Sequence, residues 1–223
     1  LTHAGAINYA KIDLKCIHSE TIFPDNLSQL NDFDGIIVAP GFGDRGIEGK
    51  ILASQYAREN KIPYFGICLG MQCAVIEFAR NVLGYKDAHS TEMTRMTEHP
   101  VIDLMEEQKG VTEKGGTMRL GAYPCEIKKG TLVHSIYNKE FTSERHRHRY
   151  EFNSDFLEDY EKAGMIASGI NPDSQLVEIM ELPKHPWFVG VQFHPEYRSS
   201  VLDPHPLFVN FVKAALLSRK DNK

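Results

Sequence analysis

Between residues 34 and 83 the same succession of features occurs two times: a short apolar run, a turn that contains glycine, and a helical pattern. The apolar runs cover 34–39 and 62–67, and the helical patterns cover 48–60 and the stretch that ends at Leu83. Strands that alternate with helices at such short intervals are typical of a parallel, doubly wound sheet. We therefore predict an α/β fold with a mostly parallel central sheet flanked by helices.

The pattern outside these two units predicts the remaining elements. Residues 11–18 alternate apolar and charged side chains, which predicts a strand, and 84–116 carry only a weak pattern with one apolar run at 101–104. The C-terminal half is strand-rich, with predicted strands at 118–123, 131–137, 145–152, 165–170, 176–182 and 187–193. Helices are predicted over 156–163 and 207–217. We predict one domain over 1–223 that lacks its first strand, because residues 1–5 resemble the glycine-closed end of a helix.

Composition excludes several classes of protein. The 223 residues are 42% hydrophobic and 25% charged, and the net charge is -5. This balance does not favour a nucleic acid or an anionic membrane as partner, and no apolar stretch approaches the length of a membrane span. The spacing of the four cysteines fits neither a disulfide framework nor a metal site, which favours a reducing, cytoplasmic location and no metal.

Residues 41–46, GFGDRG, match the G-x-G-x-x-G pattern of dinucleotide-binding folds. That chemistry needs an acidic residue at the end of the next strand, to hold the ribose hydroxyls. Here the next strand ends in the sequence FGIC, without a carboxylate. No P-loop pattern occurs in the chain either. We therefore set aside dinucleotide binding, and ATP binding by means of a P-loop.

The strand that ends without a carboxylate delivers Cys68 instead. Residues 66–70, GICLG, form a G-x-C-x-G between a predicted strand and a predicted helix, the cysteine counterpart of the G-x-S-x-G nucleophile elbow. The N-terminus of the following helix favours the thiolate form, which is the reactive one. We predict that Cys68 is a nucleophile, whereas Cys16, Cys73 and Cys125 are structural.

A cysteine nucleophile needs a base, and His194 is the candidate. It follows the strand predicted at 187–193 directly, and Glu196 lies two residues further on, where a carboxylate can orient the imidazole. His185 precedes that strand, at the opposite edge of the sheet, and is interpreted as structural. In an elbow enzyme the backbone N–H after the nucleophile, here Leu69, and an N–H from a neighbouring loop, here Gly41, can stabilise an oxyanion.

Taken together, GICLGMQ at 66–72, FHPE at 193–196 and the PGFG loop at 40–43 resemble the class I glutamine amidotransferases. Further stretches are similar to the glutaminase domains of the CTP synthase family, and the similarity covers nearly the whole chain. They are EGKI at 48–51, FARNV at 78–82, STE at 90–92, GTMRLG at 116–121 and ERHRHRY at 144–150.

The resemblance implies glutamine hydrolysis through a cysteine thioester. It implies Cys68 as nucleophile, His194 as base and Glu196 as the residue that orients it. It also implies that glutamine contacts Gly41, Phe42, Leu69, Gln72, Glu92 and Arg149. One departure from the family is Pro40, which stands where a glycine is common and has no N–H to donate to an oxyanion.

For the full-length protein, the resemblance implies a synthetase domain that uses ATP and Mg²⁺ to aminate UTP with the released ammonia. It further implies GTP as an activator and a homo-oligomer. Two alternatives stay open from the residues alone. The chain can be another class I amidotransferase or a free-standing γ-glutamyl hydrolase, or it can be an inactive module with a regulatory role.

Overall fold

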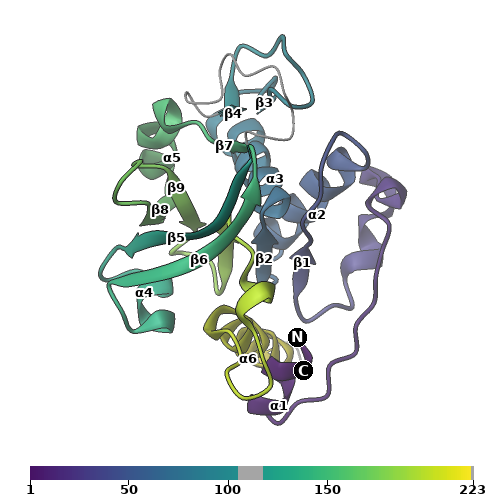
Figure 1. The fold of residues 1–223 in the computed structure, drawn as a ribbon. Coiled ribbons are helices and arrows are strands. Elements are labelled where there is room, and N and C mark those ends of the chain that lie inside the picture. Colours follow the sequence, from purple (N-terminus) through teal and green to yellow (C-terminus); the bar gives the residue numbers. More distant parts are fainter. Residues whose placement is uncertain (105–117, 222–223) are drawn as a thin grey trace.

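The computed structural model describes residues 1–104 and 118–221. Within them, the central sheet has the strand order β1-β2-β10-β9-β8-β5-β6, and a smaller sheet has the order β3-β4-β7 (Figure 1). The strands of the central sheet are β1 (Ile36–Val38), β2 (Tyr64–Ile67), β5 (Arg119–Ile127), β6 (Phe141–His148), β8 (Ile166–Ile170), β9 (Val177–Glu181) and β10 (Phe188–Val191). Those of the smaller sheet are β3 (His89–Ser90), β4 (Pro100–Leu104) and β7 (Tyr150–Phe152).

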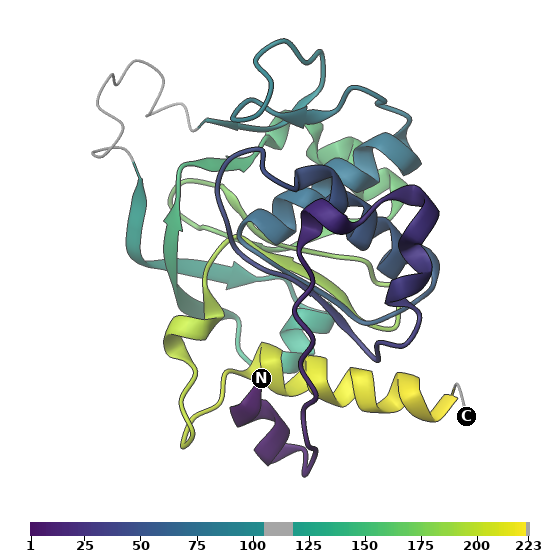
Figure 2. The ribbon, with the colours of Figure 1, turned by 90° about the vertical axis from the view of Figure 1, so that its right-hand side faces the viewer.

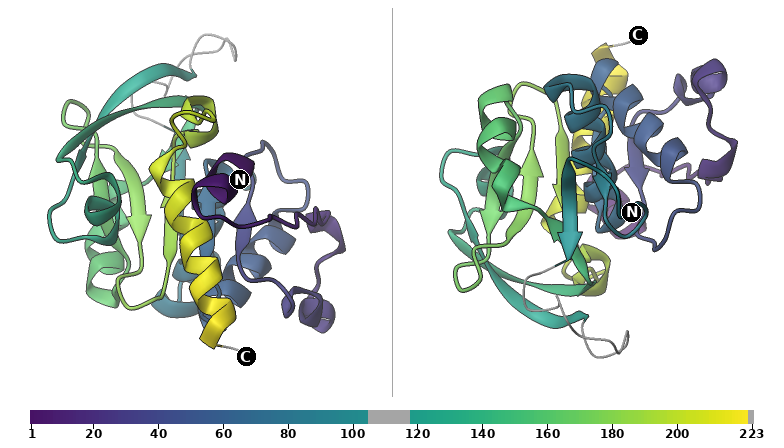
Figure 3. Two further views of the ribbon diagram at one scale, coloured as in Figure 1. Left: turned by 90° about the horizontal axis from the view of Figure 1, so that it is seen from below. Right: turned by 90° about the horizontal axis from the view of Figure 1, so that it is seen from above.

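Helices cover both faces of the central sheet, as Figures 2 and 3 show. They are α1 (Thr2–Ile7), α2 (Ile47–Glu59), α3 (Leu69–Phe78), α4 (Leu132–Tyr137), α5 (Leu157–Ala163) and α6 (Pro206–Asp221), and a π-helical turn, Ala79–Leu83, extends α3. One apolar core includes side chains of α2, α3 and α5, and a second includes side chains of α1, α4 and α6. Tyr64 and Phe65, neighbours on β2, belong to different cores because successive side chains of a strand point to opposite faces. The predicted α/β fold with flanking helices is confirmed.

Strand pairing in the central sheet is mixed. β2 pairs in parallel with β1 and with β10, whereas β10–β9, β9–β8, β8–β5 and β5–β6 are antiparallel. The sheet was predicted to be mostly parallel, but only β1, β2 and β10 pair in this way. The pairs β8–β9 and β9–β10 are joined by short connections, which suit antiparallel neighbours, whereas parallel neighbours need a crossover.

The strand predicted at 131–137 is wrong, because most of this stretch forms the helix α4. The Thr131 side chain accepts a hydrogen bond from the backbone N–H of His134. The Glu181 carboxylate, on β9, accepts the N–H groups of Leu132 and Val133 at 2.9 and 3.0 Å. These acceptors satisfy the free N–H groups of the first turn, so the helix is stabilised by a partner distant in the sequence.

The strand predicted at 11–18 is also wrong, since this segment has no regular secondary structure. A groove of about 880 Å³ is lined both by residues of this segment, such as Ile12, and by residues of β1, such as Ile36. Figure 1 shows the segment as the purple trace beside β1. Without a neighbouring strand within hydrogen-bonding distance, the segment forms no ladder. Part of the weak stretch predicted at 84–116, residues 105–116, lies outside the described residues.

Candidate active site

Cys68 occupies a sharp turn between β2 and α3. Its φ of 53° and ψ of -104° place the backbone in a region that side chains rarely adopt, and its N–H donates to Val191 O of β10 at 2.7 Å. Both flanking glycines are required by their surroundings. A Cβ on Gly66 would lie 2.6 Å from the carbonyl carbon of Gly70, and a Cβ on Gly70 would lie 2.1 Å from Val38 O. The predicted nucleophile-elbow geometry is present.

The Cys68 thiol is buried, with the residue 3% exposed. Burial is the largest influence on its acidity and raises the pKa of Cys68 to about 12. A hydrogen bond from the Leu69 N–H opposes this effect, and the charges of Glu196, Glu92 and Glu151 add to it. The expected net stabilisation of the thiolate by the helix N-terminus is therefore outweighed by burial. At neutral pH the resting group is a thiol, which needs a base to become a nucleophile.

His194 carries the features of such a base. It follows β10 and precedes the 3-10 segment Pro195–Arg198, and its Nδ1 lies 2.7 Å from Glu196 Oε1. A carboxylate in this position accepts the Nδ1 proton, which leaves Nε2 as the basic atom of a neutral imidazole. Nε2 is buried and has no hydrogen-bond partner among the described residues. The ring stacks on Tyr197, with the centroids 5.1 Å apart.

The sheet brings Cys68 and His194 to the same edge. β2 and β10 are parallel neighbours, and Ile67 lies opposite Val191. Cys68 follows the first strand at once and His194 follows the second by three residues, so both lie beyond the carboxyl ends of adjacent parallel strands. That edge is where α/β folds gather their sites.

A cavity of about 230 Å³ opens beside Cys68. Six residues predicted from the sequence line it, and they are Gly41, Phe42, Cys68, Gln72, Glu92 and Arg149. Three lining residues were not predicted: Met118, His148 and Tyr150. Leu69, His194 and Glu196, which were also predicted, do not line this cavity. The larger groove beside β1 lacks any cysteine or histidine among its described lining residues, so the smaller cavity is the one that fits the candidate chemistry.

Arg149 lies at a corner of the backbone. The run predicted as one strand at 145–152 splits here, since β6 ends at His148 in the central sheet and β7 begins at Tyr150 in the smaller sheet. Arg145 and Arg147 are exposed, while Arg149 is half-buried and lines the cavity. The break between the sheets is therefore what turns the last arginine of this run towards the site.

Opposite charges meet in the cavity, because Glu92 lines it together with Arg149. Glu92 Oε1 accepts the N–H of Gly43 at 3.0 Å, which ties the carboxylate to the glycine loop. In the same loop, a Cβ on Gly41 would lie 3.1 Å from Leu69 Cδ2. The loop that matched a dinucleotide pattern thus approaches the residue after the nucleophile.

The last glycine of that pattern, Gly46, and Gly49 beyond it have packing roles. A Cβ on Gly46 would lie 2.2 Å from Ser19 Oγ, and a Cβ on the nearby Gly49 would lie 1.8 Å from Ser19 O. The segment around Ser19 packs so closely that only glycine fits at these two positions.

Two buried amides lie beneath the thiol. Gln72 Nε2 donates to Tyr150 O at 3.0 Å and to Gln192 Oε1 at 3.3 Å, and Gln192 Nε2 points at Cys68 Sγ from 3.7 Å. Gln192 was not predicted as a site residue. Its place two residues before His194, on the same strand end, was the available signal.

Comparison with known proteins agrees with this geometry. The profile of the family described as glutamine amidotransferase class-I matches residues 4–214. The chain belongs to the class I glutamine amidotransferase family. Among relatives, it is 65% identical over 214 residues to the CTP synthase of Cytophaga hutchinsonii and 61% identical over 219 residues to that of Flavobacterium johnsoniae. These matches cover 96% and 98% of the chain but 40% and 41% of the relatives.

A similar solved structure indicates which kind of amidotransferase domain the chain resembles. The Trypanosoma brucei CTPS glutaminase domain with bound acivicin is 39% identical, with a TM-score of 0.90. The superposition covers 96% of this chain and 84% of that one. The chain therefore shares the fold and family of this amidotransferase domain, while it spans about 40% of the length of the curated relatives.

Within residues 1–104 and 118–221, no group of three or more histidine, cysteine or acidic side chains is placed to hold a metal ion. No described helix is long and apolar enough to cross a membrane. The four cysteines are free.

Proposed function

We propose that this amidotransferase domain hydrolyses L-glutamine to glutamate and ammonia, with Cys68 as the nucleophile. The observation that carries the proposal is that a buried thiol on a nucleophile elbow and His194 lie beyond the carboxyl ends of adjacent parallel strands. Nδ1 of His194 is hydrogen-bonded to Glu196, and its Nε2 has no partner among the described residues. His194 is the base, and Glu196 orients its imidazole.

The cavity suits a free amino acid with an amide side chain. Glu92 can bind the α-ammonium group and Arg149 the α-carboxylate, since the two side chains bring opposite charges to one cavity of about 230 Å³. Gly41, Phe42 and Gln72 contribute further contacts along its wall. A substrate held at its charged end leaves its side-chain amide for the thiol.

The steps follow from these positions. His194 Nε2 takes the proton of the Cys68 thiol, and Sγ attacks the amide carbon of glutamine. The N–H groups of Leu69 and Gly41 stabilise the oxyanion of the tetrahedral intermediate, whose collapse breaks the C–N bond. His194 returns the proton to the leaving ammonia, and a γ-glutamyl thioester remains on Cys68. Water, deprotonated by His194, then attacks the thioester and releases glutamate and the thiol.

We further propose that the released ammonia aminates UTP to CTP in a synthetase domain of the same protein. The likeness to CTP synthases, of which this chain spans about 40%, supports the assignment. In that arrangement ATP and Mg²⁺ act in the synthetase domain, GTP is an activator, and the protein is a cytoplasmic homo-oligomer. Free cysteines agree with a reducing compartment.

The test uses the full-length protein and its Cys68→Ala variant. We expect the variant to lose glutamate release from L-glutamine and glutamine-dependent CTP formation. CTP formation from added ammonia should be retained, because the variant leaves the synthetase chemistry intact. Loss of the ammonia-dependent reaction as well would contradict the division into two half-reactions. A folded wild-type protein that releases no glutamate would favour the inactive-module alternative, and hydrolysis of other γ-glutamyl compounds in preference to glutamine would favour the hydrolase.

A further inference from the structure

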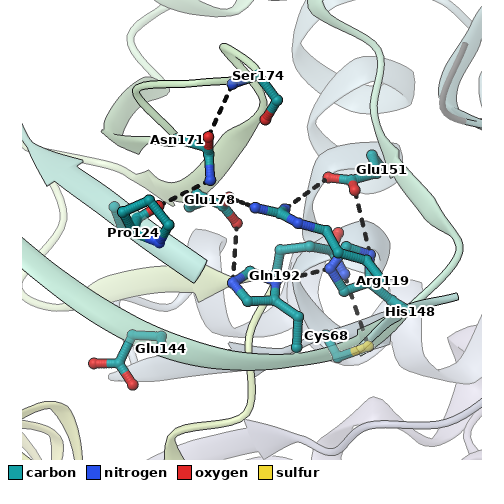
Figure 4. A network of polar contacts seen from close by, with 12 residues as sticks. Cys68, Arg119, Pro124, Glu144, His148, Glu151, Asn171, Ser174, Glu178 and Gln192 are labelled. Atoms are coloured by element: carbon teal, nitrogen blue, oxygen red, sulfur yellow. Dashed lines mark hydrogen bonds and ion pairs between the residues drawn. The ribbon is translucent and has the colours of Figure 1, made fainter. Parts of the chain in front are cut away.

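Behind the candidate site lies a buried polar cluster that the proposed steps do not use (Figure 4). It joins Arg119 of β5, His146 and His148 of β6, Glu151 of β7 and Glu178 of β9. These residues are at most 6% exposed. Because these groups are buried, each acceptor needs a hydrogen-bond donor from the protein. The positions of the hydrogen atoms can therefore be assigned from the partners.

The nitrogen that carries the proton in each of the two imidazoles can be assigned by starting from the contact between His148 and Tyr150 O. His148 Nδ1 lies 3.2 Å from Tyr150 O, and a carbonyl oxygen only accepts, so Nδ1 carries the proton. A neutral His148 then has a bare Nε2, which lies 2.8 Å from His146 Nδ1. His146 must therefore donate from Nδ1, and a neutral His146 has its bare nitrogen at Nε2.

That bare nitrogen faces a carboxyl oxygen. His146 Nε2 lies 3.5 Å from Glu178 Oε2, and both atoms are buried without a hydrogen-bond partner among the described residues. The other oxygen of Glu178 accepts from Arg119 at 2.6 Å. If both facing atoms were bare, two lone pairs would oppose each other in the interior, whereas one proton between them satisfies both.

We propose that Glu178 holds a proton and donates it to His146, and that the chain Glu178–His146–His148–Tyr150 O fixes the backbone corner that presents Arg149 to the glutamine cavity. Its effect on glutamine binding rests on the function proposed above. Tyr150 O also accepts from Gln72, whose amide contacts the Gln192 side chain beneath Cys68. One carbonyl therefore links the proton-holding chain to the floor of the site.

The local electrostatics place this proton on the carboxyl group. Burial raises the pKa of Glu178 to about 7, against the lowering effects of Arg119 and Asn171. Burial lowers the pKa of His146, and it lowers the pKa of His148 to about 3. Other titratable groups that act on this cluster include Cys125 and His194, as well as Tyr123, whose ring contacts Arg119 and His146.

Two variants of the full-length protein separate the role of the proton on Glu178 from the role of the size of its side chain. Glu178→Gln keeps an oxygen for Arg119 and an N–H for His146 but cannot ionise, whereas Glu178→Met keeps the length and loses both. We expect the KM for glutamine of the wild type to rise above about pH 7, as the carboxyl group loses its proton. The KM of Glu178→Gln should stay constant with pH. That of Glu178→Met should be raised roughly 3- to 10-fold at every pH, the range expected when the site responds to the lost hydrogen bond to His146, with kcat changed less.

Infrared spectroscopy tests the proton without any assay of activity. A protonated carboxyl group has a C=O band distinct from that of a carboxylate, and at about pH 6 we expect Glu178→Gln to lose one such band. The matched control is Glu181→Gln on the same strand. Its carboxylate is also buried, but both oxygens accept backbone N–H groups, so neither needs a proton and no such band should be lost.

Loss of no band in Glu178→Gln would overturn the proposal, and so would an unchanged KM in Glu178→Met. A band lost as expected in a protein that does not hydrolyse glutamine would leave the proton assigned and contradict the proposed function instead.

Discussion

The two halves of the central sheet surround Cys68 in different ways. In β1, β2 and β10 the buried positions are apolar or glycine, and the strands are parallel. The antiparallel half buries charged or titratable side chains, which include Arg119, Glu144, His146, His148, Glu178 and Glu181. In the parallel half, close packing of the backbone positions the nucleophile. In the antiparallel half, hydrogen bonds between buried side chains position the cavity wall. Steric changes should therefore damage the first half, and changes of protonation the second.

The largest effect is expected from Gly70→Ala, in the half that depends on backbone fit. The new Cβ would lie 2.1 Å from Val38 O, a backbone atom that cannot move without shifting β1. We expect a loss of roughly 4 kcal/mol in the free energy of unfolding, at the upper end for a core substitution. Urea unfolding followed by circular dichroism measures it.

Gly130→Ala is the matched control for that change. Its φ of 81° is left-handed, unlike that of Gly70, but nothing lies within 4 Å of the added Cβ. The cost should be about 1 kcal/mol, from the backbone conformation alone. Equal losses in the two variants would show that close packing around Gly70 is not what the elbow requires.

A smaller effect, dependent on pH, is expected in the charged half. Burial raises the pKa of Glu178 from 4.5 to about 7, so the folded state binds more protons than the unfolded state between these values. Stability should therefore fall as the pH rises from 4.5 to about 7, by roughly 3 kcal/mol, and this contribution should be constant above. Glu178→Gln, which has no proton to lose, should flatten this part of the curve of unfolding free energy against pH. An unchanged slope would mean that the carboxyl group is ionised throughout.

The smallest effect is expected from Pro40→Gly, which restores the glycine common in the family. If Gly41 and Leu69 supply the oxyanion donors, kcat/KM for glutamine should change by no more than about threefold, since the new N–H is not needed. A gain of roughly a hundredfold, the usual value of one oxyanion donor, would show that the chain lacks a donor at this position. Initial rates of glutamate release distinguish the two results.

Short-range sequence patterns predicted the parallel half of the sheet better than the antiparallel half with its buried charges. The two strand–turn–helix units and the G-x-C-x-G elbow consist of contiguous residues. The turn at Cys68 and the helix after it could therefore be predicted. His194 and Glu196 follow a strand directly, which made their pairing predictable too. Each of these inferences needs only short-range steric or positional reasoning.

The errors and omissions have a common cause in partners that are distant in the sequence. Residues 131–137 were predicted as a strand, because nothing local reveals that Glu181 caps the first turn of a helix there. Residues 11–18 have the alternation of a strand but no neighbour to pair with. His148 was missed because its contacts, with His146 and with the corner at Arg149, depend on where β6 leaves the central sheet.

The central claim is that Cys68 forms a covalent γ-glutamyl thioester, and mass spectrometry of the protein quenched in acid during glutamine turnover tests it most directly. We expect the peptide that contains Cys68 to gain the mass of one γ-glutamyl group, and the Cys68→Ala protein to show no adduct on any peptide. An adduct on Cys16, Cys73 or Cys125, or the absence of any adduct at all quench times while glutamate accumulates, would contradict the account.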